Sequence, residues 1–204
     1  MEVELIDIGK KFERHFVFRG VTHSFKTGDK TAILGGNGSG KSTLLKIISG
    51  SMTSTEGELI IHDQGKAVKV EDYMRRVAFA GPYTDLIDEY NLEEIVEFTS
   101  KFRTWRNGMS NVDVIEATRL QKVSKRPLAN YSSGMRQRVR LALAILADTP
   151  VLLLDEPTSN LDERAIQWFR RLLEANVDGR ILFIGSNDEA YETELCTGEI
   201  SLRK

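Results

Sequence analysis

The chain has 204 residues, a length typical of one domain or of two small ones. Its 28 basic and 30 acidic residues give a net charge of −2, which argues against a nucleic-acid partner held by electrostatic attraction. The longest uninterrupted apolar stretch covers residues 141–147, too short for a membrane helix, and the amino terminus lacks the pattern of a signal peptide. The single cysteine, Cys196, favours a reducing compartment, so we expect a soluble chain in the cytoplasm.

The first third of the chain predicts mostly strands and turns, with one helix. Apolar residues alternate or run together, as in strands, near residues 3–8, 21–25, 31–34, 58–61, 67–70 and 77–80. Over residues 44–48 they recur at helical spacing, and Gly50 follows where a helix end favours a positive φ angle. We therefore expect an antiparallel β part at the amino terminus.

The middle of the chain is predicted to be helical, and the last third alternates strands with helices. Caps and apolar periodicity predict helices over residues 91–102, 114–120, 133–148 and 164–175. Fully apolar runs at residues 151–154 and 181–184 are typical of central strands in a parallel sheet. The fold class is therefore α/β, with a mainly parallel sheet and a helical insertion at about residues 85–148.

A glycine-rich segment at residues 35–43 follows the pattern G-x-x-x-x-G-K-[ST], between an apolar strand and a helix. Glycines let backbone N–H groups converge on phosphate oxygens, and the helix adds the positive end of its dipole. We expect Lys41 to reach the β- and γ-phosphates of ATP and Ser42 to bind Mg²⁺. The residues expected to contact ATP are Gly35, Gly36, Asn37, Gly38, Ser39, Gly40, Lys41, Ser42 and Thr43. The structural alternative is a glycine-rich turn with a chance lysine.

Two acidic residues, Asp155 and Glu156, end the apolar run at residues 151–154. The carboxyl edge of a parallel sheet is where α/β proteins bind ligands. We expect Asp155 to hold Mg²⁺ through water and Glu156 to orient the attacking water at the γ-phosphate. Taken alone, two acids here could simply be solvated, but together with the glycine-rich loop they favour phosphoryl transfer.

Residues 131–137, Tyr-Ser-Ser-Gly-Met-Arg-Gln, resemble the signature sequence of ABC ATP-binding subunits, usually Leu-Ser-Gly-Gly-Gln. Residues 159–162 look like the D-loop of that family, with Ser159, Asn160, Leu161 and Asp162. Phe12 stands where the family places an aromatic ring under adenine, and the alternative is that it covers the sheet; His15 and Phe16 are weaker candidates. The resemblance extends over essentially all 204 residues. It implies a single ABC ATP-binding domain over residues 1–204, with a P-loop ATPase core.

The resemblance also implies the function and the partners. ATP hydrolysis, with Mg²⁺ as cofactor, would power a transporter through closure of two ATP-binding domains, either two copies or a paralogue pair. In that pair, ATP bound to one domain meets the other domain's signature, here Ser132, Ser133, Gly134 and Met135. The chain would lie at the cytoplasmic face of the membrane through integral permease subunits. Ile87, Tyr90 and Leu92 are candidates for that contact, or for the core of the insertion.

Two positions depart from the family pattern. Pro82 stands where a glutamine is usual, and residues 65–120 contain no glutamine. Asn187 stands in for a histidine, and no histidine follows His62. An amide can donate a hydrogen bond to a γ-phosphate but does not titrate near pH 7.

Two functional hypotheses therefore remain open. In the first, the chain hydrolyses ATP with altered helper residues, and Glu156, Lys41 and Asn187 are the catalytic residues. In the second, it binds ATP with weak or no hydrolysis and acts as a regulatory or non-transport ABC protein. Soluble ABC ATPases of repair, chromosome or ribosome type usually carry a coiled coil, a second ATPase copy or a basic surface, and this sequence shows none of these.

Overall fold

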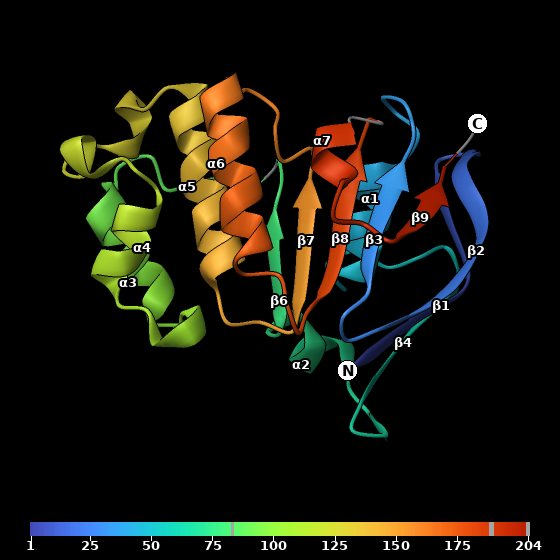
Figure 1. Ribbon diagram of the computed structural model, residues 1–204. Coiled ribbons are helices and arrows are strands. Elements are labelled where there is room, and N and C mark those ends of the chain that lie inside the picture. Colours follow the sequence, from blue (N-terminus) through green and yellow to red (C-terminus); the bar gives the residue numbers. More distant parts are fainter. Residues whose placement is uncertain (83, 188–189, 203–204) are drawn as a thin grey trace. The chain divides into compact units, whose positions relative to one another are not determined.

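The computed structural model describes residues 1–82, 84–187 and 190–202, and the chain divides into two compact units. The first unit comprises Met1–Phe79, Thr149–Glu156 and Gly179–Lys204. The second comprises Ala80–Asp148 and Pro157–Asp178, so it contains the segment after Glu156 as well as the expected helical insertion. Figure 1 shows the elements of both units in chain colours.

An antiparallel sheet in the first unit has the strand order β2-β1-β4-β5. Its strands are β1 (Glu2–Phe12), β2 (His15–Lys26), β4 (Glu56–Asp63) and β5 (Lys66–Ala67). Alternation along β1 and β2 places Val3, Leu5 and Phe25 in the core. The predicted antiparallel part is confirmed. The expected strand at residues 67–70 is wrong at its end, because helix α2 (Val70–Met74) begins there.

A second sheet in the same unit has the order β6-β7-β8-β3-β9. Its strands are β3 (Lys30–Leu34), β6 (Val77–Ala80), β7 (Val151–Asp155), β8 (Ile181–Ser186) and β9 (Gly198–Ser201). The pairs β7–β8, β8–β3 and β3–β9 are parallel, and every residue of β7 and β8 is buried. The predicted α/β class with a parallel sheet is confirmed, and the carboxyl ends of β3, β7 and β8 share one edge (Figure 1).

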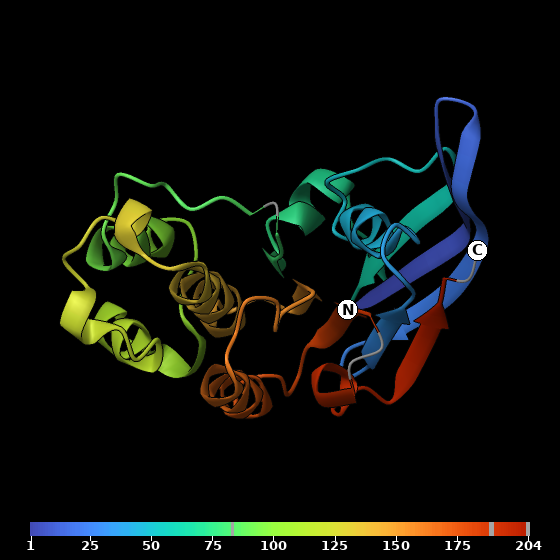
Figure 2. The same cartoon turned by 90° about the horizontal axis from the view of Figure 1, so that it is seen from above.

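Helix α1 (Lys41–Ile48) packs its apolar residues into the core of the first unit, and Figure 2 shows it end-on. Leu44 and Leu45 are fully buried and share one cluster with Leu5 of the antiparallel sheet and with Leu153 and Phe183 of the parallel sheet. Gly50 ends the helix with a φ angle of 79°, as its position predicts. Helix α7 (Ala190–Thr193) completes the unit.

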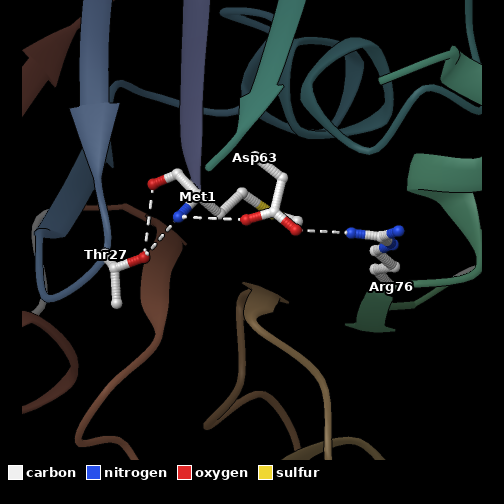
Figure 3. Close-up of polar contacts among 4 residues, drawn as sticks. All are labelled: Met1, Thr27, Asp63 and Arg76. Carbon is white, nitrogen blue, oxygen red and sulfur yellow. Dashed lines mark hydrogen bonds and ion pairs between the residues drawn. The ribbon is translucent and has the colours of Figure 1, made fainter. Parts of the chain in front are cut away.

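A polar cluster joins the start of β1 to the end of β4, as Figure 3 shows. The Met1 amino group donates to the Thr27 hydroxyl at 3.0 Å and lies 3.7 Å from Asp63 Oδ1. Arg76 Nη1 donates to Asp63 Oδ2 at 2.8 Å. These contacts connect the ends of β2 and β4, the two strands that pair with β1, to the segment that precedes β6.

The second unit is helical, as predicted. It contains α3 (Leu92–Ser100), α4 (Asn111–Ala117), α5 (Ser133–Leu146), α6 (Glu163–Glu174) and the short 3₁₀ turns η1 (Arg106–Gly108), η2 (Gln121–Val123) and η3 (Leu128–Asn130). Asn91 and Glu94 form the capping box of α3, and Ser110 and Asp113 form that of α4. The helix predicted over residues 91–102 ends earlier: α3 stops at Ser100, and Phe102 lies beyond it with a side chain that is 73% exposed.

The described part of the chain holds no helix that is both long enough and apolar enough to cross a membrane.

Candidate nucleotide site

The loop between β3 and α1 has a backbone that needs glycine. Gly40 precedes α1 with a φ angle of 104°, and a Cβ there would lie 2.5 Å from Val17 Cγ1. A Cβ on Gly35 would overlap the Ser39 hydroxyl and lie 2.8 Å from the Leu202 carbonyl oxygen. The loop is therefore closely surrounded by β2 and the end of the chain's last described segment. Gly36, Asn37 and Gly38 are exposed, which leaves the outer side of the loop open to a ligand.

Lys41 is the first residue of α1, and its side chain is only 4% exposed. Its Nζ donates to the carbonyl oxygens of Gly35 at 2.8 Å and Gly36 at 3.3 Å. It also donates to Asn187 Oδ1 at 2.7 Å and lies 3.6 Å from Glu156 Oε1. The ammonium group therefore contacts both the backbone of the loop and the side chains of Asn187 and Glu156.

Asn187 and Glu156 are brought together by two adjacent strands. Glu156 follows β7 and Asn187 follows β8, and the two strands pair in parallel. Asn187 Nδ2 donates to Glu156 Oε1 at 3.1 Å, while its Oδ1 accepts from Lys41. One amide thus uses its donor on the carboxylate and its acceptor on the ammonium group. The structure brings together three residues predicted from separate motifs, which lie as far as 146 positions apart in the chain.

Asp155 is the last residue of β7 and is 1% exposed. Burial raises the pKa of its carboxyl, whereas a hydrogen bond from Ser42 lowers it. Its Oδ1 is buried and has no hydrogen-bond partner among the described residues. A buried, unsatisfied carboxylate oxygen beside a hydroxyl suits a hard divalent cation, which prefers oxygen ligands. Asp155 and Ser42 therefore fit Mg²⁺.

Gly185 is a site residue that sequence reasoning missed. It pairs with Asp155 across β7 and β8, and a Cβ there would lie 2.9 Å from Asp155 Oδ1 and 2.9 Å from Leu45 Cδ1. Only glycine leaves room for that carboxylate oxygen at the strand end. The available sign was a glycine at the end of an otherwise apolar strand, which often marks a close approach.

Phe12 ends β1 and its ring is 48% exposed. Lys10 Nζ lies 5.3 Å from the ring centroid. Phe16, the weaker candidate, is instead covered by Arg19, whose Cζ lies 4.2 Å from the ring centroid. Phe12 therefore offers more open aromatic surface than Phe16. His15 is exposed, and Thr43 is half-buried on α1.

The residues that resemble the signature lie in the second unit, at the start of α5. Ser132 is the helix N-cap, and its hydroxyl accepts from the Met135 N–H at 3.2 Å. Ser133 opens the helix. A Cβ on Gly134 would lie 2.8 Å from the Asn160 carbonyl oxygen, so the predicted signature and D-loop residues are in close contact. Gln137 is 3% exposed and donates to the Pro157 carbonyl at 2.9 Å, which is a second contact between α5 and the segment that leads to the D-loop residues.

The predicted D-loop residues Ser159, Asn160, Leu161 and Asp162 connect to α6 in the same unit. Asp162 is the N-cap of α6, and its Oδ1 accepts from the Ala165 N–H at 2.8 Å. The structure thus places the loop lysine and the acidic residues on the first unit, and the signature and D-loop residues on the second.

Pro82 is exposed and belongs to a turn near the start of the second unit. The Thr84 hydroxyl is hydrogen-bonded to the backbone of Gly81, and Arg140 Nε donates to the Thr84 carbonyl at 2.7 Å. The Thr84 hydroxyl is therefore engaged by the backbone of this turn. Of the residues considered for a permease contact, Leu92 is fully buried and Ile87 is 37% exposed.

Comparison with known proteins decides the family. Residues 18–159 match the family model described as ABC transporter. This chain is an ABC transporter ATP-binding subunit. It is 31% identical to the sulfate/thiosulfate import ATP-binding protein CysA 2 of Rhizobium meliloti (strain 1021), over the whole chain but only 58% of that relative. It is 27% identical to the uncharacterized ABC transporter ATP-binding protein YybJ of Bacillus subtilis (strain 168), over 95% of the chain and 89% of that relative.

Solved ABC structures share the fold. An ATP-binding subunit of an ABC transporter matches with a TM-score of 0.80 and 26% identity, over 100% of this chain and 86% of the other. The dimeric cassette MJ0796, bound to ADP and phosphate, matches with a TM-score of 0.81 and 24% identity, over 98% and 94% of the two chains. The predicted α/β ABC ATPase fold is confirmed. This ABC subunit spans little more than half the length of the CysA relatives it matches.

Proposed function

We propose that this ABC subunit binds ATP with Mg²⁺, hydrolyses it, and powers a transporter through ATP-dependent closure of a pair of ATP-binding domains. The observation that carries the proposal is the Lys41–Asn187–Glu156 network. A general base for water must lie beside the group that holds the phosphates, and Glu156 Oε1 lies 3.6 Å from Lys41 Nζ. Asn187 bridges the two, so the departure from histidine leaves the base oriented.

The residues divide the work by their chemistry. The loop backbone and Lys41 would bind the phosphates, since backbone N–H groups and an ammonium ion supply the positive field. Glu156 would accept a proton from the attacking water. Asn187 would hold Glu156 with one hydrogen of its Nδ2 and donate the other to the γ-phosphate. Asp155 and Ser42 would hold Mg²⁺, which neutralises charge on the phosphate oxygens when bound. Phe12 would stack on adenine.

The second half of the site would come from a partner domain. Ser132 caps α5, and Ser133, Gly134 and Met135 form its first turn, where the helix dipole and the backbone N–H groups would attract an anion. This chain has one phosphate loop and one signature, so a head-to-tail pair would complete two sites. The MJ0796 dimer supports this arrangement through its shared fold. In this proposal, integral permease subunits hold the chain at the cytoplasmic face of the membrane.

Turnover of the purified protein tests hydrolysis. Glu156→Gln should lower the rate of phosphate release by at least about a hundredfold, because it removes the proton acceptor. Lys41→Ala should weaken nucleotide binding as well. Asn130→Asp, an exposed change at the end of η3, is the matched control. An unmodified protein no faster than Glu156→Gln would refute the hydrolysis proposal.

Sedimentation tests closure. Glu156→Gln with ATP and Mg²⁺ should form a dimer, because nucleotide binding is retained while hydrolysis is blocked. The same variant with ADP provides the control and should stay monomeric. A monomer at high protein concentration with saturating ATP would count against the closure step.

A second candidate is ATP binding with slow hydrolysis in a regulatory role. Pro82 favours it, because its side chain has neither donor nor acceptor and Thr84 is occupied by the local turn. The two candidates differ in one measurement. Slow hydrolysis predicts tight ATP binding with turnover equal to that of Glu156→Gln, whereas the main proposal predicts a clear difference.

A further inference from the structure

Glu156, the proposed base, has a backbone conformation that needs support from its neighbours. Its φ angle is 46°, in the left-handed region that residues other than glycine rarely adopt. The next residue is Pro157, and a residue before proline favours an extended conformation instead. Such a strained backbone persists only where surrounding contacts hold it. The contacts on both sides of Glu156 therefore help to fix where its carboxylate lies.

One hydrogen bond lies on each side of this strained residue. The Glu156 N–H donates to the Gly185 carbonyl at 2.8 Å, which continues the pairing of β7 with β8. On the other side, Gln137 Nε2 donates to the Pro157 carbonyl at 2.9 Å. Gln137 lies on α5 and is 3% exposed, so water does not readily replace this bond. The residue after Glu156 is thus held by a buried side chain of α5.

Arg140 lies three residues further along α5 and fixes the orientation of the Gln137 amide. Its Nη1 donates to Gln137 Oε1 at 3.4 Å, so the amide oxygen faces the guanidinium group and Nε2 faces the Pro157 carbonyl. An amide turned over would place its oxygen against that carbonyl and its NH₂ group against the cation. Only one orientation therefore gives two attractive contacts, and Arg140 supports the bond that Gln137 donates.

The same guanidinium group is anchored at the turn that contains Pro82. Arg140 Nε donates to the Thr84 carbonyl at 2.7 Å, and the Thr84 hydroxyl closes the turn through the Gly81 backbone. One guanidinium group can make both contacts at once, because its donors are held in a planar fork. A row of hydrogen bonds therefore runs from this turn through Arg140 and Gln137 to the residue after the proposed base.

We propose that Gln137 and Arg140 are positioning residues for Glu156. They hold the residue after the base and tie it to the turn at Pro82, whose own side chain has no donor for a ligand. A displacement of that turn would reach the Glu156 carboxylate through these bonds and would leave the phosphate loop unchanged. The role of Glu156 as the base rests on the proposed function, whereas the hydrogen bonds do not.

The first arm of the test measures amide hydrogen exchange by NMR without nucleotide, so it does not depend on hydrolysis. Gln137→Met keeps the length of the side chain but removes its donor. Exchange of the Glu156 amide should become about tenfold faster, the effect of losing one buried hydrogen bond. The amide of Leu153, in the middle of β7, should keep its rate. Arg140→Met should act in the same direction, and Arg171→Met, an exposed change on α6, is the matched control.

The second arm measures turnover. Gln137→Met should lower kcat about tenfold and leave the KM for ATP unchanged, because the phosphate loop is not touched. In the Glu156→Gln background, the same substitution should have no further effect, since the base through which it acts is already absent. A merely structural role would lower the rate by the same factor in both backgrounds.

Three results would overturn the proposal. The first is equal exchange of the Glu156 amide in Gln137→Met, Arg140→Met and Arg171→Met. The second is equal acceleration of the Glu156 and Leu153 amides, which a general loss of stability would produce. The third is an unchanged kcat, or additive effects, in a protein that hydrolyses ATP. If the unmodified protein is no faster than Glu156→Gln, the hydrolysis proposal fails and the exchange of the Glu156 amide alone decides the role of Gln137.

Discussion

Asn187→Asp tests the amide bridge with almost no change in shape. The new carboxylate keeps an acceptor for Lys41 but loses the donor that Asn187 Nδ2 directs at Glu156 Oε1, 3.1 Å away. It also places a second negative charge beside the first. A purely steric role for Asn187 would leave the activity unchanged, whereas a bridging role predicts a loss.

The magnitude follows from the contact that is lost. A hydrogen bond to a charged group contributes about 1.5–3 kcal/mol, and about 1.4 kcal/mol corresponds to a tenfold change in rate. The Glu156 side chain is 31% exposed, so water replaces part of that interaction. We therefore expect a loss at the lower end of that energy range, which corresponds to a decrease in kcat of roughly tenfold.

The assay is the steady-state rate of phosphate release over a range of pH. Two adjacent carboxylates hold a shared proton more tightly than one, so the acidic limb of the Asn187→Asp profile should move to higher pH. Asn130→Asp, at the exposed end of η3, is the matched control. A kcat and a pH profile equal to those of Asn130→Asp would refute the bridging role of Asn187.

Three further predictions concern other parts of the candidate site. Because burial raises the pKa of Asp155, the folded protein binds its proton more tightly than the unfolded chain, and stability falls as the pH rises through that window. Asp155→Asn should thus raise the melting temperature without nucleotide by about 3 °C and abolish stabilisation by ATP with Mg²⁺; a lower melting temperature would contradict this. Phe12→Ala should weaken ATP binding by roughly tenfold in a titration, with little change in stability because the ring is half-exposed, and equal affinity would exclude stacking. Gly134→Ala should reduce ATP-driven dimerisation, since its Cβ would lie 2.8 Å from the Asn160 carbonyl oxygen, and wild-type sedimentation would show that the contact tolerates a methyl group.

Local patterns predicted much of the fold. The apolar runs at β7 and β8 identified buried parallel strands, and Asn91 identified the start of α3, because each pattern acts within a few residues. The strand expected at residues 67–70 was wrong because apolar residues near a hairpin do not show where pairing stops. The predicted helix extended to Phe102 for a similar reason. The helix ends at Ser100, because the spacing of apolar residues does not show where a helix stops.

The candidate site was predictable by motif but not by geometry. The glycine-rich loop and the acidic pair at the end of β7 stand out in the sequence. The contacts of Asn187 with Lys41 and Glu156 do not, because they depend on which strands are neighbours.

The strand order of the parallel sheet has a consequence for synthesis. Strand β8 lies between β7 and β3, yet both neighbours precede it in the chain. As the polypeptide emerges from the ribosome, the edges of β3 and β7 that later pair with β8 are therefore unpaired. Unpaired strand edges can form hydrogen bonds with other chains and so promote aggregation. The insertion of β8 covers the edges of β3 and β7 that face it and, one residue later, delivers Asn187 to Lys41; β9 then covers the other edge of β3. Closure of the gap between β3 and β7 and assembly of the nucleotide site are thus completed by the same late event.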